Sequence, residues 1–310
     1  MKSRVQSLVA FSLFGAMAAC STEPTAPALS ARQDVVQASS TTGVVVYNNI
    51  PSVLPGNVLS QGYQCCATAE LGDNISFGGT ARRAKSATVL MSSWSLRSTY
   101  PGADAAGYSH PITLNIYAGS HPGGVGTRGP LLATITKTFL IPWRPEADPT
   151  CPGGTAWRYN AVTCYNGFAF TIEFDLTSIG LTLPSEIVYG VAFNTNTWGY
   201  NPIGLPGPYE SLNVGLVAAP PTVGVDVEPD AVFWNTKIAG WYSDGGAGGF
   251  GIFRRDTGWS GYVPAVSFSA YAFPTTSAEC KNGGWQSLTR ADLTPFSNQG
   301  DCVSYVQNGK

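Results

Sequence analysis

Charged residues are scarce in this chain of 310 residues. Asp, Glu, Lys and Arg together make up 12% of it, about half of their usual share in globular proteins. The hydrophobic fraction is nevertheless 44%. A disordered acidic or basic chain has many charges and few apolar groups, and helical bundles and coiled coils build their surfaces from Glu, Lys and Arg. The composition therefore excludes both classes.

The chain also has no excess of basic residues, and histidine is scarce. The chain has 17 Lys and Arg against 19 Asp and Glu, so we expect no nucleic-acid partner. The only two histidines, His110 and His121, lie outside any Cys/His cluster with metal-ligand spacing, which excludes a zinc site. Both precede proline, and no Gly-x-Ser-x-Gly elbow is present, so we interpret them as loop histidines and assign no catalytic residue.

The N-terminus reads as an export signal. Lys2 and Arg4 precede a mostly apolar, uncharged stretch, residues 5–19, which is shorter than the roughly 20 residues of a membrane-spanning helix. A positive start followed by a short apolar stretch is typical of a secretion signal, which we assign to residues 1–19.

A lipid anchor is expected directly after this signal. The sequence Met-Ala-Ala-Cys at residues 17–20 resembles a bacterial lipobox, and the resemblance implies a lipid on Cys20. By resemblance to Gram-negative lipoproteins, a residue other than Asp after the Cys, here Ser21, implies sorting to the outer membrane. The alternative is ordinary cleavage after Ala18, which leaves Cys20 as a thiol. Residues 20–43 are rich in Ser, Thr, Ala and Pro, so we expect a lipid-anchored flexible tether.

The remaining cysteines predict disulfides, because an exported chain with an even number of cysteines usually pairs them. They are Cys65, Cys66, Cys151, Cys164, Cys280 and Cys302. Closeness in sequence favours Cys151 with Cys164 and Cys280 with Cys302. Cys65 and Cys66 are then left to each other as a vicinal disulfide, or as free thiols.

Residues 44–273 predict one all-β domain, an antiparallel jelly-roll-like β-sandwich with long loops. Short runs of Val, Ile, Thr, Phe and Tyr alternate with Gly, Pro, Asn and Ser. The expected strands are residues 44–47, 74–77, 87–93, 112–117, 131–140, 168–176, 187–194, 212–217, 232–235 and 265–273. The expected long loops are residues 97–110, 118–130, 141–166, 196–210 and 239–262.

This domain resembles a family of secreted bacterial β-sandwich domains of unassigned activity. The segments that carry the resemblance are residues 70–75, 92–94, 113–117, 188–195 and 207–216. The resemblance implies a fold and a location at the cell surface, and it implies no catalytic activity. Cys65 and Cys66 depart from the family pattern.

Residues 274–310 differ from the sandwich and read as a linker and a small disulfide-closed C-terminal segment. The segment resembles a short Cys-bracketed tail module found at the ends of other exported bacterial proteins. A disulfide between Cys280 and Cys302 would contribute about 3 kcal/mol to the stability of a piece too short to build its own core.

Several aromatic rings fall in the predicted loops, where a flat ring can stack on the apolar face of a sugar. They are Trp198, Tyr200, Tyr209, Trp241, Tyr242, Trp259 and Tyr262. All but Tyr242 are taken as ligand-binding candidates. The alternative is that these rings cover the ends of the sandwich.

Clustered acids suggest a second kind of site. Asp226, Glu228 and Asp230 alternate, so in an extended segment they would share one face and offer oxygens to Ca²⁺. Glu70 and Asp73 are a second candidate pair. The alternative is a set of solvated acids on a sheet edge. No other cofactor is expected.

The sequence therefore predicts a non-catalytic lipoprotein of the bacterial envelope, at the outer membrane or the cell surface. Its partners would be the membrane, through the lipid, and a glycan bound by loop aromatics. Two alternatives remain: a structural envelope protein that contacts other envelope components, and a polysaccharide hydrolase with an unusual acid pair.

Overall fold

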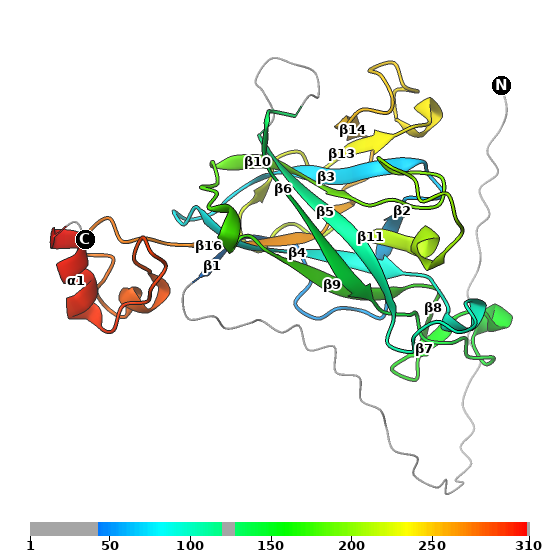
Figure 1. The fold of residues 1–310 in the computed structure, drawn as a ribbon, viewed down its shortest axis with the longest axis horizontal. Coiled ribbons are helices and arrows are strands. Elements are labelled where there is room, and N and C mark those ends of the chain that lie inside the picture. The colour runs from blue at the N-terminus through cyan, green and yellow to red at the C-terminus, as the bar shows by residue number, and fades with distance from the viewer. Residues whose placement is uncertain (1–42, 120–127, 309–310) are drawn as a thin grey trace, which may run out of the picture. The chain divides into compact units, whose positions relative to one another are not determined.

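The computed structural model describes residues 43–119 and 128–308. In this part of the chain the strands form two seven-stranded sheets and one two-stranded hairpin, and the paired strands run antiparallel. The two large sheets pack as layers of a sandwich (Figure 1). The predicted all-β antiparallel sandwich is confirmed. The predictions made for Cys20 and His121 fall outside the described residues.

The first sheet has the order β1-β16-β4-β11-β15, with β9 paired to β4 and β2 paired to β11. Its strands are β1 (Val44–Asn48), β2 (Leu59–Gly62), β4 (Arg83–Ser93), β9 (Phe168–Asp175), β11 (Leu212–Val217), β15 (Val263–Pro264) and β16 (Val266–Tyr271). The long strand β4 is central, because β9 pairs with it on one side and β16 and β11 pair with it on the other.

The second sheet has the order β14-β13-β3-β10-β5-β6, with β12 also paired to β3. Its strands are β3 (Thr68–Ser76), β5 (Tyr108–Ala118), β6 (Leu131–Ile141), β10 (Glu186–Ala192), β12 (Val225–Asp226), β13 (Ala231–Thr236) and β14 (Arg254–Thr257). The hairpin consists of β7 (Trp157–Tyr159) and β8 (Thr163–Tyr165). Short 3₁₀ helices are η1 (Arg97–Thr99), η2 (Pro152–Gly154), η3 (Thr177–Ile179), η4 (Pro208–Ser211), η5 (Ala239–Trp241) and η6 (Gly284–Ser287).

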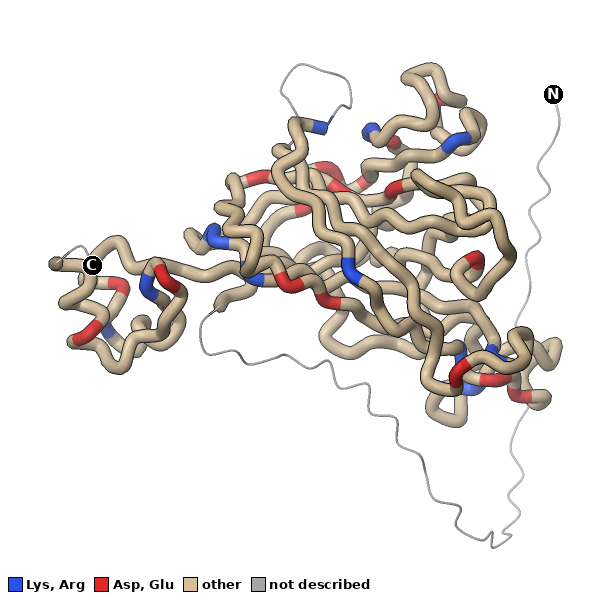
Figure 2. Tube along the Cα trace, in the orientation of Figure 1, with Lys and Arg blue, Asp and Glu red and all other residues tan. Residues whose placement is uncertain are grey.

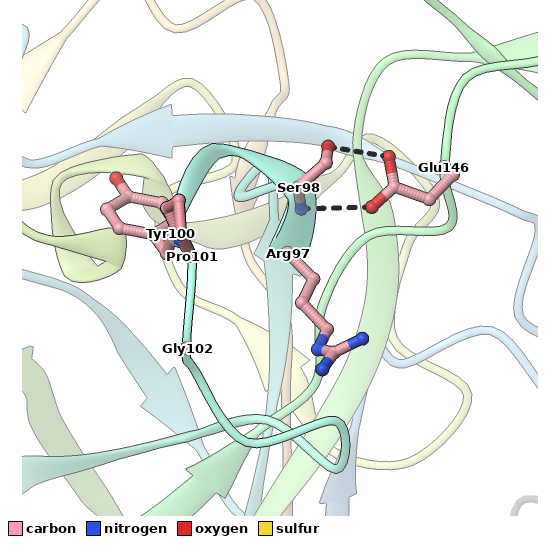
Figure 3. Close-up of a pocket in the computed structure, with 6 residues that line it drawn as sticks. All are labelled: Arg97, Ser98, Tyr100, Pro101, Gly102 and Glu146. Atoms are coloured by element: carbon pink, nitrogen blue, oxygen red, sulfur yellow. Dashed lines mark hydrogen bonds between the residues drawn. The ribbon is translucent and has the colours of Figure 1, made fainter.

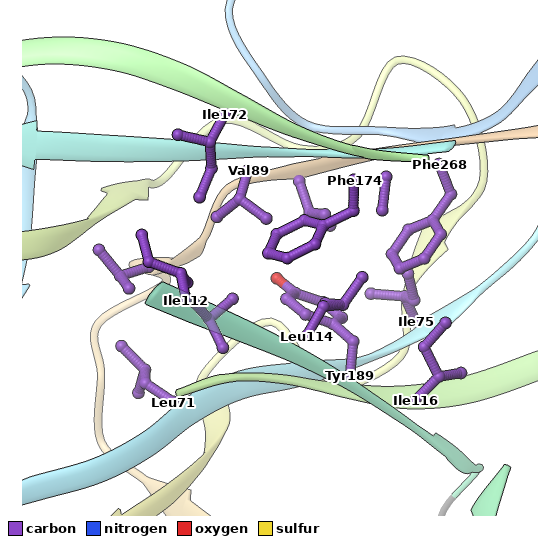
Figure 4. Packing of buried hydrophobic residues seen from close by; sticks show 14 of the residues in the cluster. Leu71, Ile75, Val89, Ile112, Leu114, Ile116, Ile172, Phe174, Tyr189 and Phe268 are labelled. Carbon is purple, nitrogen blue, oxygen red and sulfur yellow. The ribbon is translucent and has the colours of Figure 1, made fainter. Parts of the chain in front are cut away.

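The core lies between the two sheets, where alternate residues of each strand point inward. On β9, Phe170, Ile172 and Phe174 are buried while the residues between them are exposed. They belong to one cluster with Leu114 of β5 and Phe268 of β16 (Figure 4). Full burial of such side chains contributes about 1.5–3 kcal/mol each, so alternation in sequence translates directly into cohesion between the sheets.

The ten predicted strands coincide with β1, β3, β4, β5, β6, β9, β10, β11, β13 and β16. The unpredicted strands, β2, β7, β8, β12, β14 and β15, have two to four residues, too few to show alternation. Strand β3 begins at Thr68, six residues before the predicted start. The prediction missed its first half because that half carries Glu70, Gly72 and Asp73 instead of alternating apolar residues.

Two of the predicted disulfides are present. Cys151 is bonded to Cys164, and Cys280 is bonded to Cys302. Of the two alternatives for Cys65 and Cys66, the structure has the free thiols and not the vicinal disulfide.

The C-terminal segment has a small core around its disulfide. Cys280 and Cys302 are buried with Leu288 and Phe296. Phe296 also meets Tyr305 edge-on, with ring centroids 5.3 Å apart. Tyr305 lies on the helix α1 (Gln299–Asn308), which the sequence analysis did not predict. This helix holds Cys302, so the disulfide fastens it to the start of the segment.

Charges are dispersed over the described part of the chain. Figure 2 shows acids and bases intermixed. Four ion pairs are formed there, among them Arg158 with Asp148 and Arg255 with Glu228. Over the same residues, no helix has the length and apolar character that crossing a membrane requires.

Candidate functional site

An exposed indole stands at the end of the central strand. Trp94 directly follows β4, and the period of two along a strand puts Leu90, Ser92 and Trp94 on one face of the sheet. Leu90 is fully buried in a small apolar cluster on this face, whereas 41% of Trp94 is exposed. Along this face the side chains therefore change from buried at Leu90 to solvent-exposed at Trp94.

Polar side chains surround the indole. The Trp94 Nε1 donates to Ser92 Oγ at 3.0 Å, and Ser92 Oγ donates to Asn57 Oδ1 at 2.7 Å. Gly167 makes room for this arrangement, because a Cβ there would lie 2.5 Å from Asn57 Nδ2 and 2.6 Å from Trp94 Nε1. The segment before β2 and the start of β9 thus converge on the same spot.

Asn213 of β11 extends this arrangement. With its amide nitrogen turned to donate to Leu212 O at 3.0 Å, its oxygen accepts from Ser60 Oγ at 3.0 Å and from Trp94 Nε1 at 3.3 Å. We call Asn57, Ser60, Ser92, Trp94 and Asn213 the Trp94 cluster. Its side chains are all uncharged and combine an apolar ring with amide and hydroxyl groups, the combination that suits a neutral polyhydroxyl ligand.

A shallow pocket of about 280 Å³ lies a few residues farther along the same segment (Figure 3). Its lining residues are Arg97, Ser98, Tyr100, Pro101, Gly102 and Glu146. The Ser98 backbone N and its Oγ donate to the two carboxylate oxygens of Glu146 at 3.1 and 2.8 Å. The guanidinium of Arg97 and the carboxylate of Glu146 thus give this pocket polar groups of both signs.

Stacked rings support this pocket from the loops. Tyr100 stacks on Trp143 with a centroid distance of 5.8 Å and an interplanar angle of 25°. Trp143 also contacts Tyr108, and its Nε1 donates to the Asp104 carbonyl at 2.7 Å. Partial burial, with the charge of Glu210 nearby, raises the pKa of Tyr100, so its phenol stays neutral and able to donate.

The rings named from sequence lie in several different settings. Tyr209 stacks on His110 with centroids 5.2 Å apart. Trp259 donates from Nε1 to Asp256 Oδ2 at 2.9 Å, and its backbone carbonyl accepts from the Tyr262 nitrogen at 3.0 Å. Both Trp259 and Tyr262 pack against the core, so much of their ring surface is used in folding.

Three further rings of the prediction differ sharply in exposure. Trp198 is half-buried, Tyr242 is buried, and 48% of Trp241 is exposed. The one proton of the Tyr242 hydroxyl is shared between the carbonyls of Trp234 and Ile252, and its oxygen accepts from the Thr236 nitrogen, which fixes the loop between β13 and β14. Of these three rings, Trp241 is therefore the one most open to solvent.

Tyr200 is held at a buried carboxylate. It donates to Glu70, which is fully buried and also accepts from Asn115 Nδ2 at 2.8 Å and from the Tyr117 hydroxyl at 2.9 Å. Burial raises the pKa of Glu70, and the three donors together with the charge of Arg128 lower it in part. The Tyr200 ring thus secures its loop to the sheet.

The predicted calcium site is not formed. Only Val225–Asp226 is extended, because the chain turns before Pro229; Asp226 Oδ1 accepts from the Glu228 nitrogen at 3.0 Å. Glu228 instead pairs with Arg255 Nε at 2.5 Å. Within residues 43–119 and 128–308, no three Asp, Glu, His or Cys side chains are grouped to hold a metal ion, so the prediction for Asp226, Glu228 and Asp230 is wrong.

The second acid pair is separated by the strand itself. Glu70 and Asp73 are three residues apart on β3, so their side chains project from opposite faces. Asp73 is buried between the sheets, where desolvation, with Asp226 nearby, raises its pKa well above the ordinary value. Burial therefore favours the neutral form of Asp73, and its side chain lies on the opposite face of the strand from Glu70.

His110 lies in β5 and not in a loop, which corrects the interpretation from sequence. Its ring is buried between Tyr209 and Phe193. Burial lowers its pKa to about 4, although a hydrogen bond with the Asn194 backbone works in the opposite sense. The imidazole is therefore neutral at physiological pH and packs as an aromatic ring.

Comparison of this chain with protein families, with curated proteins and with solved structures gave no match. The candidate sites rest on their own geometry. The sequence analysis missed the Trp94 cluster, although one signal was present: period two along β4 places Ser92 and Trp94 together on a face that becomes polar at the strand end. Asn57 and Asn213 lie in segments remote in sequence, and only the sheet order brings them there.

Proposed function

We propose that this chain is a non-catalytic glycan-binding module that is exported and held at the bacterial envelope, at the outer membrane or the cell surface, by a lipid on Cys20. The observation that carries the binding proposal is the Trp94 cluster. A partly exposed indole beside two amides and two hydroxyls matches the alternation of apolar faces and hydroxyl groups on a sugar.

The pocket beside η1 supports the same proposal. Tyr100 gives it an aromatic wall, while Arg97 and Glu146 supply charged hydrogen-bonding groups at its surface. Trp94 and all the pocket-lining residues except Glu146 lie on one segment, residues 94–102. A saccharide longer than one unit could therefore meet ring and hydrogen-bonding groups at more than one point of this segment.

Export and anchoring rest on the sequence and on cysteine use. The apolar N-terminal stretch ends in Met-Ala-Ala-Cys, and two disulfides suit an oxidising compartment outside the cytoplasm. Mass spectrometry of the mature N-terminus tests this part. A lipid-modified Cys20 is expected at the start of the mature chain, and an unmodified Cys20 thiol would contradict the anchor.

A glycan array followed by calorimetric titration tests binding. The Trp94→Ala variant is expected to lose at least about tenfold in affinity, because truncation of a hot-spot aromatic ring typically costs about 2 kcal/mol or more, and about 1.4 kcal/mol corresponds to tenfold. Phe250→Ala is the control, since it removes another exposed aromatic ring, 59% against 41%, which lies outside the Trp94 cluster and is not a binding candidate. An unmodified chain that binds no glycan on the array ends the proposal. Recovery of envelope proteins alone in affinity purification would favour the structural alternative.

A further inference from the structure

Two neighbouring thiols are presented on a tight turn between β2 and β3. Cys65 is exposed, Cys66 is half-buried, and both are free. The turn is closed by a hydrogen bond from the Thr68 nitrogen to the Tyr63 carbonyl at 3.0 Å. Ala67 has a positive φ of 52°, a conformation that L-residues seldom adopt. The backbone of this turn is therefore narrowly specified.

Neighbouring segments hold this turn in place. The Thr236 hydroxyl donates to the Cys66 carbonyl at 2.7 Å, and the Lys237 nitrogen donates to the Ala67 carbonyl at 2.9 Å. Gln64 Nε2 donates to Thr197 Oγ1 at 3.1 Å. The thiols thus sit on a fixed support at the surface, anchored by the chain after β13 and by the loop after β10.

The two neighbouring thiols influence each other's ionisation. Interaction with the Cys65 thiol and with the Gln61 side chain lowers the pKa of Cys66 to about 7, while interaction with Cys66 and burial raise the pKa of Cys65. At neutral pH about half of Cys66 is therefore thiolate, beside a protonated thiol at Cys65.

The backbone of β2 leaves space for this arrangement. A Cβ on Gly62 would lie 2.8 Å from the Cys65 sulfur, so the sulfur rests against a residue without a side chain. The other four cysteines in the described part of the chain are bonded in two disulfides. The described part of the chain thus has one disulfide in the loop of residues 151–164, one in the C-terminal segment, and one pair of neighbouring free thiols.

We propose that Cys65 and Cys66 form a thiol–disulfide exchange site, in which Cys66 attacks a substrate disulfide and Cys65 resolves the product. The Cys66 thiolate attacks one sulfur of the substrate, so a new S–S bond forms while the substrate S–S bond breaks and its other sulfur leaves with the electron pair. Cys65 then gives up its proton and attacks the Cys66 sulfur. This step releases the second substrate sulfur as a thiol and leaves a Cys65–Cys66 disulfide.

The substrate disulfide is itself the oxidant, so the exchange requires no other redox partner. The disulfide substrate takes up two electrons and two protons and becomes two thiols, and the dithiol of the turn is oxidised by the same amount. Because Cys66, the attacking residue, is half-buried beside the exposed Cys65, the turn suits a small disulfide or one on an extended, accessible peptide. The same steps run in reverse would pass a disulfide from the turn to a partner dithiol.

Oxidised glutathione is the probe for the test. The full chain with Cys20→Ser, which removes the seventh cysteine, is first brought to the free-thiol form at the turn, and a peptide map checks that both other disulfides remain. The expected product is a Cys65–Cys66 disulfide without bound glutathione. In the same background, Cys65→Ser is expected to stop with glutathione on Cys66, and Cys66→Ser is expected to react roughly tenfold more slowly, because an ordinary thiol is mostly protonated at neutral pH.

Three outcomes would overturn the proposal. One is equal reaction rates for the two single variants, another is a parent chain that keeps glutathione attached, and the third is no reaction at the turn. Circular dichroism of each variant and the map of its two remaining disulfides show whether the sandwich is intact. Serine is nearly isosteric with cysteine, so a rate change in an intact variant reports on sulfur chemistry and not on folding.

Discussion

The phenol of Tyr200 donates a hydrogen bond to the carboxylate of Glu70, a residue 130 positions earlier in the chain. Tyr200 is more than half exposed, while Glu70 on β3 has no exposed surface. A surface loop is thus fastened to the sheet through a buried acid. Asn115 and Tyr117 of β5 complete the set of donors around that acid.

Removal of the phenol hydroxyl should weaken the fold. Tyr200→Phe leaves a buried carboxylate with one donor fewer, and we expect the free energy of unfolding to fall by about 1–3 kcal/mol in urea titrations at neutral pH. In a Glu70→Gln background the same substitution should cost less, because a neutral amide requires less compensation. Equal losses in both backgrounds would show that the hydroxyl does not act on Glu70.

Stability should depend on His110 in mildly acidic solution. Its pKa is about 4 in the folded chain against an ordinary value of 6.5, so between these values the unfolded chain binds more protons. Stability is therefore fully present above about pH 6.5 and is lost as the pH falls towards 4. Between pH 7 and pH 5 the loss attributable to this residue should be about 2 kcal/mol.

The variant His110→Phe keeps a ring between Tyr209 and Phe193 but has no titrating group. Its urea midpoint should fall less than that of the parent chain between pH 7 and pH 5. Acids with raised pKa values, such as Glu70 and Asp73, contribute equally to both chains and cancel in the comparison. Parallel pH profiles for the two chains would contradict the assignment of a neutral buried imidazole.

Gly190 should not tolerate a methyl group. A Cβ there would lie 2.1 Å from Glu70 Oε1, so the buried carboxylate would have to leave its hydrogen-bond donors. We expect Gly190→Ala to cost about 1–3 kcal/mol in free energy of unfolding. Gly240→Ala is the matched control, because a Cβ at Gly240 meets no atom within 4 Å. Similar stability of the two variants would show that Glu70 adapts without loss.

Loss of the Cys151–Cys164 disulfide should destabilise the chain by about 3 kcal/mol in the chain-entropy description of a loop of this size, with a separation of 13 residues. The double variant Cys151→Ser, Cys164→Ser should show this as a lower urea midpoint. The hairpin β7–β8 lies within the loop, so its amide protons should exchange faster in the variant. An unchanged midpoint would mean that the remaining contacts of the loop hold it as firmly as the bond does.

Much of the sandwich could be predicted because its central strands alternate plainly. Phe170, Ile172 and Phe174 follow period two, and all three are buried in the core. The first half of β3 could not be predicted in this way, because Glu70 is buried for its hydrogen bonds and not for apolar contact. The alternation of apolar residues along a strand predicts its hydrophobic face, but it does not predict which polar residues are buried.

The candidate sites depend on contacts that no local pattern records. Trp94 could have been noted from its position after β4, but its partner Asn213 reaches it only because β11 pairs with the end of β4. The calcium prediction failed for a local reason, since the turn that follows Asp226 ends the alternation on which it depended. The contact of Tyr200 with Glu70 likewise follows from the three-dimensional path of the loop after β10.

The position of β4 has a consequence for how the molecule opens. Thr88 in its middle is matched by Glu173 on one side and by Ser267 on the other, and the neighbouring Val89 and Leu90 are buried on the two faces of the sheet. Solvent can reach such backbone amides only when both adjoining strands separate. The backbone amides at the centre of β4 should thus exchange slowest in deuterated water, because they exchange only on global unfolding. Amides at the ends of the sandwich should exchange faster, through local opening.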